Sequence, residues 1–163
     1  EIEMAIANNS DGKNKKIEAA EKQEQDMNTG YSENPEEIRV TIKTFKGQQK
    51  KYAKVSRDTN PIHTSEFFAR LAGLPGTILH GVCVIAMCSN SLIDLIGGRD
   101  PSLMDSVSAR FSYPVIPGDI LTLVGRKYSG RDGTRVDFDV FNSRGRAVVK
   151  KGGFHIKGKV QRG

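Results

Sequence analysis

The residues best suited to chemistry lie in one short loop. It contains Asp58 and His63, with an Asn-Pro pair between them. A stiff Asn-Pro turn could fold the carboxylate and the imidazole towards one pocket, where they could hold and activate a water molecule. The same spacing has a purely structural interpretation, in which Asn60 is a helix N-cap, Pro61 is the first helical residue and Asp58 forms an Asx turn. Spacing alone favours the structural interpretation.

A second candidate is the Leu79-His80-Gly81 segment, expected in the first turn of a buried helix. Free N–H groups there point along the helix axis, and the dipole adds partial positive charge. Because Gly81 has no side chain, a ligand carbonyl could approach its N–H closely, as an oxyanion hole requires. Alternatively, Gly81 only lets the helix pass close to a sheet. We expect His80 to be a hydrogen-bonded structural histidine, and His155 to be a surface or edge residue without a site role.

The sequence also predicts the helices that would position these candidate residues. One long helix is expected over Thr77–Ile96, with Thr77 as its cap and Gly97-Gly98 as its stop. Its first three turns are apolar nearly all round, which predicts burial on all sides. Shorter helices are predicted over Lys46–Val55 and Thr64–Ala72. The second of these has large apolar side chains to bury, namely Phe67, Phe68 and Leu71.

Alternating apolar residues predict about five strands. They are expected around Ile38–Ile42, Val107–Val115, Ile120–Tyr128 and Arg135–Phe141, with a last strand ending at Ile156 or Lys157. Turn sequences between the last four suggest that these strands are consecutive and antiparallel. The predicted class is therefore α+β, with an antiparallel sheet wrapped around one long central helix.

The 163 residues allow one domain, which we expect over residues 36–158. Residues 1–35 are expected to hold a short strand remnant at Glu1–Ala7 and a flexible arm or linker over Asn8–Pro35, where apolar residues are few. Residues 159–163 are expected to form a basic tail. The absence of an initial methionine suggests a fragment or a processed product.

The charge is concentrated at one end. Lys and Arg total 25 against 19 Asp and Glu, and seven of the basic residues lie between Arg144 and Gly163, where no acid occurs. Such an end suggests an anionic partner (nucleic acid, a membrane surface or a phosphorylated ligand) or simply a solvated strand edge and tail. No stretch reaches the ~18 apolar residues of a membrane helix. Cys83 and Cys88 form neither a disulfide framework nor a metal knuckle, and they suit a reducing compartment, so a cytoplasmic location is expected.

Residues Tyr52–Gly81 (YAKVSRDTNPIHTSEFFARLAGLPGTILHG) resemble the hydratase-2 motif of the MaoC-like dehydratases. These are hotdog-fold enzymes that include (R)-specific enoyl-CoA hydratases and the dehydratase domain of fungal-type fatty acid synthases. Leu74–Ile78 is especially similar to the synthase version, and Ala109–Val115 and Pro117–Asp119 resemble the strand and turn that follow in the family. The resemblance covers roughly Val40–Lys157.

The resemblance implies a hotdog fold and an enzyme, a lyase of fatty acid metabolism that interconverts trans-2-enoyl and (R)-3-hydroxyacyl thioesters. It implies that Asp58 and His63 hold the water that adds to the enoyl group, and that the Gly81 N–H binds the thioester oxygen. No metal or redox cofactor is implied, since the substrate itself carries coenzyme A or phosphopantetheine. The acyl-thioester substrate and a homodimer, or pairing with an upstream hotdog half, are the expected partners, without nucleic acid or membrane.

Three further residues are expected to bind substrate or support the site. Asn60 would shape the loop, and His80 lies beside Gly81. Arg57 is a departure, because the family usually has glycine just before the catalytic aspartate. A side chain there could strain the loop or reach a substrate phosphate.

Three alternatives stay open at this stage. A non-catalytic acyl-thioester binding or assembly module is favoured by Arg57. A hotdog thioesterase would use a carboxylate on the central helix, and the sequence offers only Asp94 near the far end. Nucleic-acid binding through the basic end ranks last, because Phe154 is the only aromatic residue within it.

Overall fold

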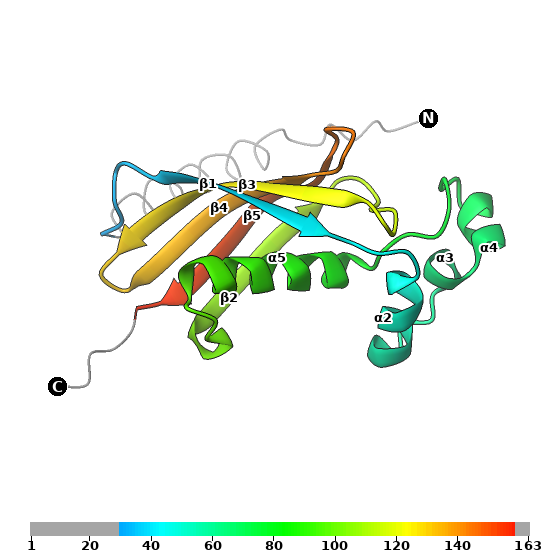
Figure 1. The fold of residues 1–163 in the computed structure, drawn as a ribbon, viewed down its shortest axis with the longest axis horizontal. Coiled ribbons are helices and arrows are strands. Elements are labelled where there is room, and N and C mark those ends of the chain that lie inside the picture. The colour runs from blue at the N-terminus through cyan, green and yellow to red at the C-terminus, as the bar shows by residue number, and fades with distance from the viewer. Residues whose placement is uncertain (1–29, 159–163) are drawn as a thin grey trace, which may run out of the picture. The chain divides into compact units, whose positions relative to one another are not determined.

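A five-stranded antiparallel sheet forms the frame of the computed structural model, which describes residues 30–158 (Figure 1). The strands are β1 Glu36–Lys43, β2 Met104–Phe111, β3 Ile120–Gly130, β4 Gly133–Phe141 and β5 Ala147–Lys157. They are ordered β1-β3-β4-β5-β2 in the sheet. The expected strand at Glu1–Ala7, most of the arm over Asn8–Pro35 and the basic tail lie outside the described residues.

The strand order confirms two of the expected hairpins and corrects a third. β3, β4 and β5 follow one another directly, but β2 pairs with β5, with Phe111 opposite Val149, and β1 pairs with β3. The expectation that β2 and β3 would be hairpin neighbours is therefore wrong. The segment 112–119 instead runs from β2, at one edge of the sheet, to β3, which lies three strand positions away. Three strand spacings amount to ~14 Å, which an extended segment of this length spans easily.

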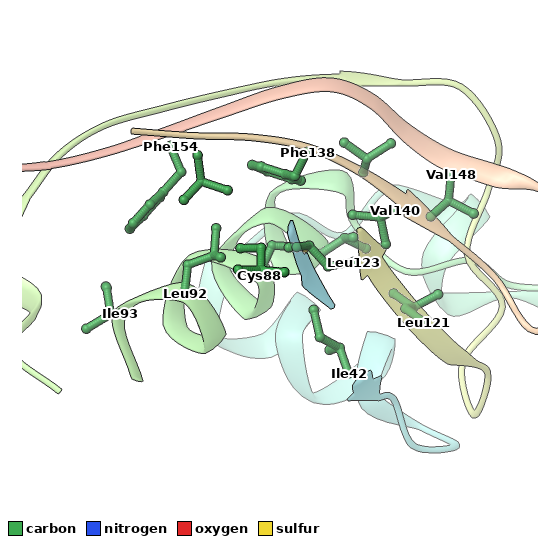
Figure 2. Packing of buried hydrophobic residues seen from close by; sticks show 14 of the residues in the cluster. Ile42, Cys88, Leu92, Ile93, Leu121, Leu123, Phe138, Val140, Val148 and Phe154 are labelled. Carbon is green, nitrogen blue, oxygen red and sulfur yellow. The ribbon is translucent and has the colours of Figure 1, made fainter. Parts of the chain in front are cut away.

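Helix α5, Gly81–Ile96, lies against the sheet and supplies the centre of the core (Figures 1 and 2). Its buried residues include Val84, Cys88 and Leu92, which belong to one apolar cluster with Leu121 and Phe154 of the strands. The predicted stop is confirmed, since the helix ends at Ile96 and the N–H of Gly97 donates to Ile93 O at 2.8 Å.

The start and the burial of α5 differ from the prediction. Residues 77–80 are extended, because Ile78 N–H donates to Ile62 O and Leu79 N–H donates to Val115 O, so Thr77 does not cap the helix. Burial on all sides is also wrong. Val82 is 68% exposed, because one sheet covers only one side of a helix.

Three short helices lie at the end of the sheet where α5 begins: α2 Gln48–Ser56, α3 Pro61–Thr64 and α4 Glu66–Leu71 (Figure 1). The single helix expected over Thr64–Ala72 is interrupted at Ser65, whose φ of −122° and ψ of 119° are extended. The expected burial of its apolar side chains is wrong, since Phe67 and Leu71 are 69% and 73% exposed and Phe68 is also exposed. Within residues 30–158, no helix combines the length and the apolar character needed to cross a membrane.

Candidate active site

The loop after α2 is fixed by local hydrogen bonds of the expected kind. Asp58 Oδ1 accepts from Asn60 N–H at 3.2 Å, and Asn60 Oδ1 accepts from Ile62 N–H at 3.3 Å as the N-cap of α3. Pro61 is the first residue of that helix. The Asx turn and the N-cap predicted by the structural interpretation are therefore present. They use one carboxylate oxygen of Asp58 and leave the other available to the site.

His63 is buried, 7% exposed, and its tautomer follows from one contact. Its Nδ1 lies 2.8 Å from Ile78 O, and a carbonyl oxygen can only accept. The proton of the neutral ring is therefore on Nδ1, and Nε2 has a free lone pair. The backbone of the segment before α5 thus orients the His63 ring so that its unprotonated Nε2 can act as a base.

His80 lies between the two candidate groups. Its ring stacks on that of His63, with centroids 3.7 Å apart and planes 22° apart. Its Nε2 lies 3.2 Å from the backbone oxygen of Asp58 and 3.9 Å from Asp58 Oδ2. Two neighbouring oxygens place the proton on Nε2, while the buried Nδ1 has no hydrogen-bond partner among the described residues. The expectation of a hydrogen-bonded histidine agrees with this geometry.

These contacts bring the carboxylate and the two imidazoles together. Each of Asp58, His63 and His80 has one side-chain oxygen or nitrogen atom, of the kind that can ligate a metal, and these three atoms lie within 4.8 Å of one another. A water molecule that makes two hydrogen bonds of about 2.8 Å at a near-tetrahedral angle bridges atoms about 4.6 Å apart. The spacing therefore fits a water held between the Asp58 carboxylate and the His63 ring.

Gly81 is the first residue of α5, so its N–H has no partner within the helix and lies at the positive end of the dipole. A Cβ there would lie 2.8 Å from the ring of Phe111, the last residue of β2. Close approach of the helix to the sheet, the structural alternative, is therefore a real reason for glycine. Gly81 also lines a cavity, so a role of its N–H in binding a ligand is compatible with this packing.

That cavity has a volume of about 400 Å³ and a mainly apolar lining. The lining residues are His63, Leu74, Ile78, Leu79, Gly81, Val84, Phe111, Ser112, Tyr113, Pro114, Val115 and Val148. Asp58 is not among these described lining residues, and its side chain is 53% exposed. The structure thus places His63 and Gly81 on the cavity and Asp58 beside it.

Two polar contacts that the sequence did not predict hold the segment before α5. Thr77 Oγ1 accepts from Gln49 Nε2 at 3.0 Å and donates to Glu66 Oε1 at 3.1 Å. Thr77 thus links α2, α4 and the segment that carries Ile78 and Gly81. Tyr52, 4.9 Å from His80 between ring centroids, was also missed, and no sequence pattern points to either contact.

Arg57 follows α2 with a φ of 60°, in the left-handed region that favours glycine. The suggestion that a side chain here strains the loop agrees with this backbone. The Arg57 side chain is exposed, and within residues 30–158 no carboxylate pairs with it. His155 lies outside the site and bonds to Asp105 at 3.1 Å. Of the two expected positions of His155, the edge position is wrong, because β5 lies between β4 and β2, whereas its exposed contact with Asp105 agrees with the surface position.

The cysteines of α5 offer no nucleophile. Cys83 and Cys88 are both free and buried. Burial raises the pKa of both thiols, that of Cys88 to about 12. At neutral pH these thiols therefore stay protonated.

Comparison with known proteins agrees with this geometry. A family model described as a MaoC like domain matches residues 14–143, and the chain belongs to that family. It is 37% identical over 97 residues to 3-hydroxyacyl-thioester dehydratase Y of Mycobacterium tuberculosis, covering 58% of this chain and 33% of that one. It is 40% identical over 93 residues to fatty acid synthase beta subunit pkiC of Emericella nidulans, covering 57% of this chain and 5% of that one.

The fold agrees with that of a solved hydratase. The unliganded R-hydratase PhaJ1 of Pseudomonas aeruginosa matches with a TM-score of 0.65 and 25% identity, over 77% of this chain and 81% of that one. The predicted family and the predicted hotdog fold are confirmed. The chain spans a third or less of the length of the two curated relatives.

Proposed function

We propose that this site adds water to trans-2-enoyl thioesters and, in reverse, dehydrates (R)-3-hydroxyacyl thioesters. The names of the relatives support this class of reaction. The observation that carries it is the His63 Nδ1 contact to Ile78 O, which leaves a lone pair on Nε2. The His63 ring lies close to Asp58, and His63 lines the same cavity as Gly81.

The residues account for each proton and charge of the reaction. Asp58 and His63 Nε2 hold the water and take its proton while the oxygen attacks C3 of the enoyl group. The electron pair of the C2–C3 double bond moves into the C1–C2 bond and the carbonyl pair moves to the thioester oxygen, where the Gly81 N–H and the α5 dipole stabilise the charge. The protonated base then returns a proton to C2, so the site ends unchanged.

A metal ion is not part of the proposal. Although Asp58, His63 and His80 are close enough to ligate, the two rings are stacked nearly parallel. The lone pair of an imidazole nitrogen lies in the ring plane, so two stacked rings direct their lone pairs side by side rather than at one ion. The substrate's own coenzyme A or phosphopantetheine is the only group that the reaction requires.

Pairing of two hotdog units is part of the proposal. The exposed face of α5 carries Val82 and Leu95, 68% and 53% exposed, and a single sheet leaves both unprotected. A partner unit would also cover the half-exposed side chain of Asp58. A homodimer, or an upstream hotdog half, would meet both needs. Light scattering at micromolar concentration should give the dimer mass for this chain, and a monomer would favour the upstream half.

The cellular location also remains a proposal. The two free, buried cysteines support a reducing compartment, and we keep the cytoplasm as the proposed location.

The direct test is hydration of crotonyl-CoA by the wild-type chain, with identification of the product's hand. We expect the (R)-3-hydroxy product. A chain inactive on short and medium enoyl thioesters that still binds them would instead be an acyl-thioester binding module. Arg57, unusual in this family, is the observation that favours this alternative.

A further inference from the structure

Arg146 lies beside the cavity and is held there by an aromatic residue. Its Nη1 donates to the Tyr113 hydroxyl at 3.0 Å, and its guanidinium lies over the Tyr113 ring, 5.0 Å from the centroid. Tyr113 and its neighbour Ser112 line the cavity that contains His63. The guanidinium is therefore one side chain away from the space assigned to the thioester.

The turn that carries Arg146 has a fixed position. Asn142 Oδ1 accepts from Arg146 N–H at 2.9 Å, and the Ser112 hydroxyl donates to Ala147 O at 2.7 Å. The first bond closes the turn between β4 and β5, and the second ties this turn to the segment after β2. A guanidinium held by a hydrogen bond and a cation–π contact loses less entropy when it binds an anion than a free side chain does.

The charge of Arg146 is not neutralised by any acidic side chain in the described part of the chain. Arg146 is exposed, and within residues 30–158 no carboxylate forms an ion pair with it. Asp119 contacts the same turn, but its Oδ1 accepts from Ser143 N–H at 3.4 Å and from Ile120 N–H at 2.9 Å. Arg146 also belongs to the C-terminal stretch that has seven basic residues and no acidic one.

We propose that Arg146, positioned by Tyr113, binds the phosphate of a phosphopantetheine-borne thioester. This inference rests on the proposed function. With the thioester between His63 and Gly81, the pantetheine arm leaves the cavity past Tyr113, and its phosphate meets the guanidinium outside. A planar guanidinium matches a phosphate through two parallel hydrogen bonds. Coenzyme A and carrier proteins share this phosphopantetheine group, so both kinds of substrate present the same phosphate.

The test compares crotonyl thioesters of 4′-phosphopantetheine and of pantetheine, which differ only in the phosphate. We expect wild type to prefer the phosphorylated ester by about tenfold in KM, as one charge-assisted contact allows. Arg146→Ala should reduce this preference to about one. Arg144→Ala removes a charge from the same turn without a Tyr113 contact, and it should keep the wild-type preference. Tyr113→Phe should give an intermediate preference.

Further arms separate the sources and the possible failures. The crotonyl ester of coenzyme A should show the same loss as the phosphopantetheine ester in Arg146→Ala. If only the coenzyme A ester is affected, a nucleotide phosphate binds there and the proposal is overturned. Equal preference in wild type and Arg146→Ala also overturns it. If wild type hydrates neither ester, the proposed function fails. Calorimetric titration with 4′-phosphopantetheine then decides the inference alone, since Arg146→Ala should bind it about tenfold more weakly.

Discussion

The sheet with α5 and the segment of α2, α3 and α4 are held together in different ways. Leu92, Leu121 and Val136 are fully buried in the core between the sheet and α5. In the short helices, Phe67 and Leu71 are more than two-thirds exposed. The first region is stabilised by apolar packing. The second depends largely on hydrogen bonds between named polar groups.

This difference separates stability from positioning. The bonds from His63 to Ile78, from Thr77 to Glu66 and within the Asp58 loop place the candidate catalytic groups without burying much apolar surface. A change in the core should therefore lower stability, whereas a change in the polar network should lower activity. The exposed apolar side chains of α4 are in turn free for a partner unit.

The largest stability effect should follow from Leu92→Ala. Leu92 is fully buried, so the lost burial and the cavity should lower the free energy of unfolding by about 2–5 kcal/mol. The matched control is Leu71→Ala in α4, which should change it by less than ~0.5 kcal/mol. Urea unfolding of both variants measures the contrast, and similar losses would show that α4 is packed after all.

Thr77→Val should affect activity more than stability. The substitution keeps the shape of the side chain but removes the hydroxyl between Gln49 and Glu66, so the segment that orients His63 and Gly81 loosens. We expect kcat for enoyl hydration to fall about tenfold while unfolding changes by ~1 kcal/mol. Thr41→Val, at an exposed position of β1, is the control. A change in stability with full activity would assign Thr77 to the fold alone.

Arg57→Gly should stabilise the loop. At a φ of 60° a non-glycine residue is strained, and relief of the strain should exceed the entropy cost of glycine by about 0.5–1 kcal/mol. Activity should be kept or raised, because glycine adopts this backbone conformation without strain and the Asp58 loop keeps its hydrogen bonds. Arg57→Ala removes the charge but keeps the strain, so it should not be stabilised. A gain of stability in Arg57→Ala would attribute the effect to charge instead.

The smallest effect is expected for the surface contacts of Asp105 with His155 and Lys157 on the sheet. A hydrogen bond from His155, and then one from Lys157, lowers the pKa of Asp105 below its ordinary value of 3.8. A lowered pKa contributes stability that is present above the ordinary value and is lost as the pH falls through the lowered one. Wild type should therefore lose slightly more stability than Asp105→Asn in thermal melts below pH 4. Parallel curves would show that this contact contributes nothing measurable.

The features that the sequence predicted are those with local causes. Five strands follow from alternation, the end of α5 from Gly97-Gly98, and the turn at Asp58 from the Asn-Pro pair. The missed features depend on distant parts of the chain. Pairing of β2 with β5, the extended residues before α5 and the contacts of Thr77 are set by segments far apart in sequence, which spacing cannot reveal.

The candidate site shows the same division. The Asp58, His63 and Gly81 set came from a motif. The structure brings Asp58 and His63 together with His80, and it places His63 and Gly81 on one cavity. The close approach of Phe111 to Gly81 and the contact of Arg146 with Tyr113 were not predictable, because β2 and the β4–β5 turn come together only in the folded sheet.

The central claim is that Asp58 and His63 act on one water molecule, and a double-mutant cycle tests it most directly. Asp58→Asn and His63→Gln should each lower kcat for crotonyl-CoA hydration about 10²–10⁴-fold. Because both side chains serve the same water, the double variant should lose far less than the product of the two losses. Acyl-CoA binding and the melting temperature should stay close to wild type. Activity indifferent to either substitution, or losses that multiply in full, would contradict the account.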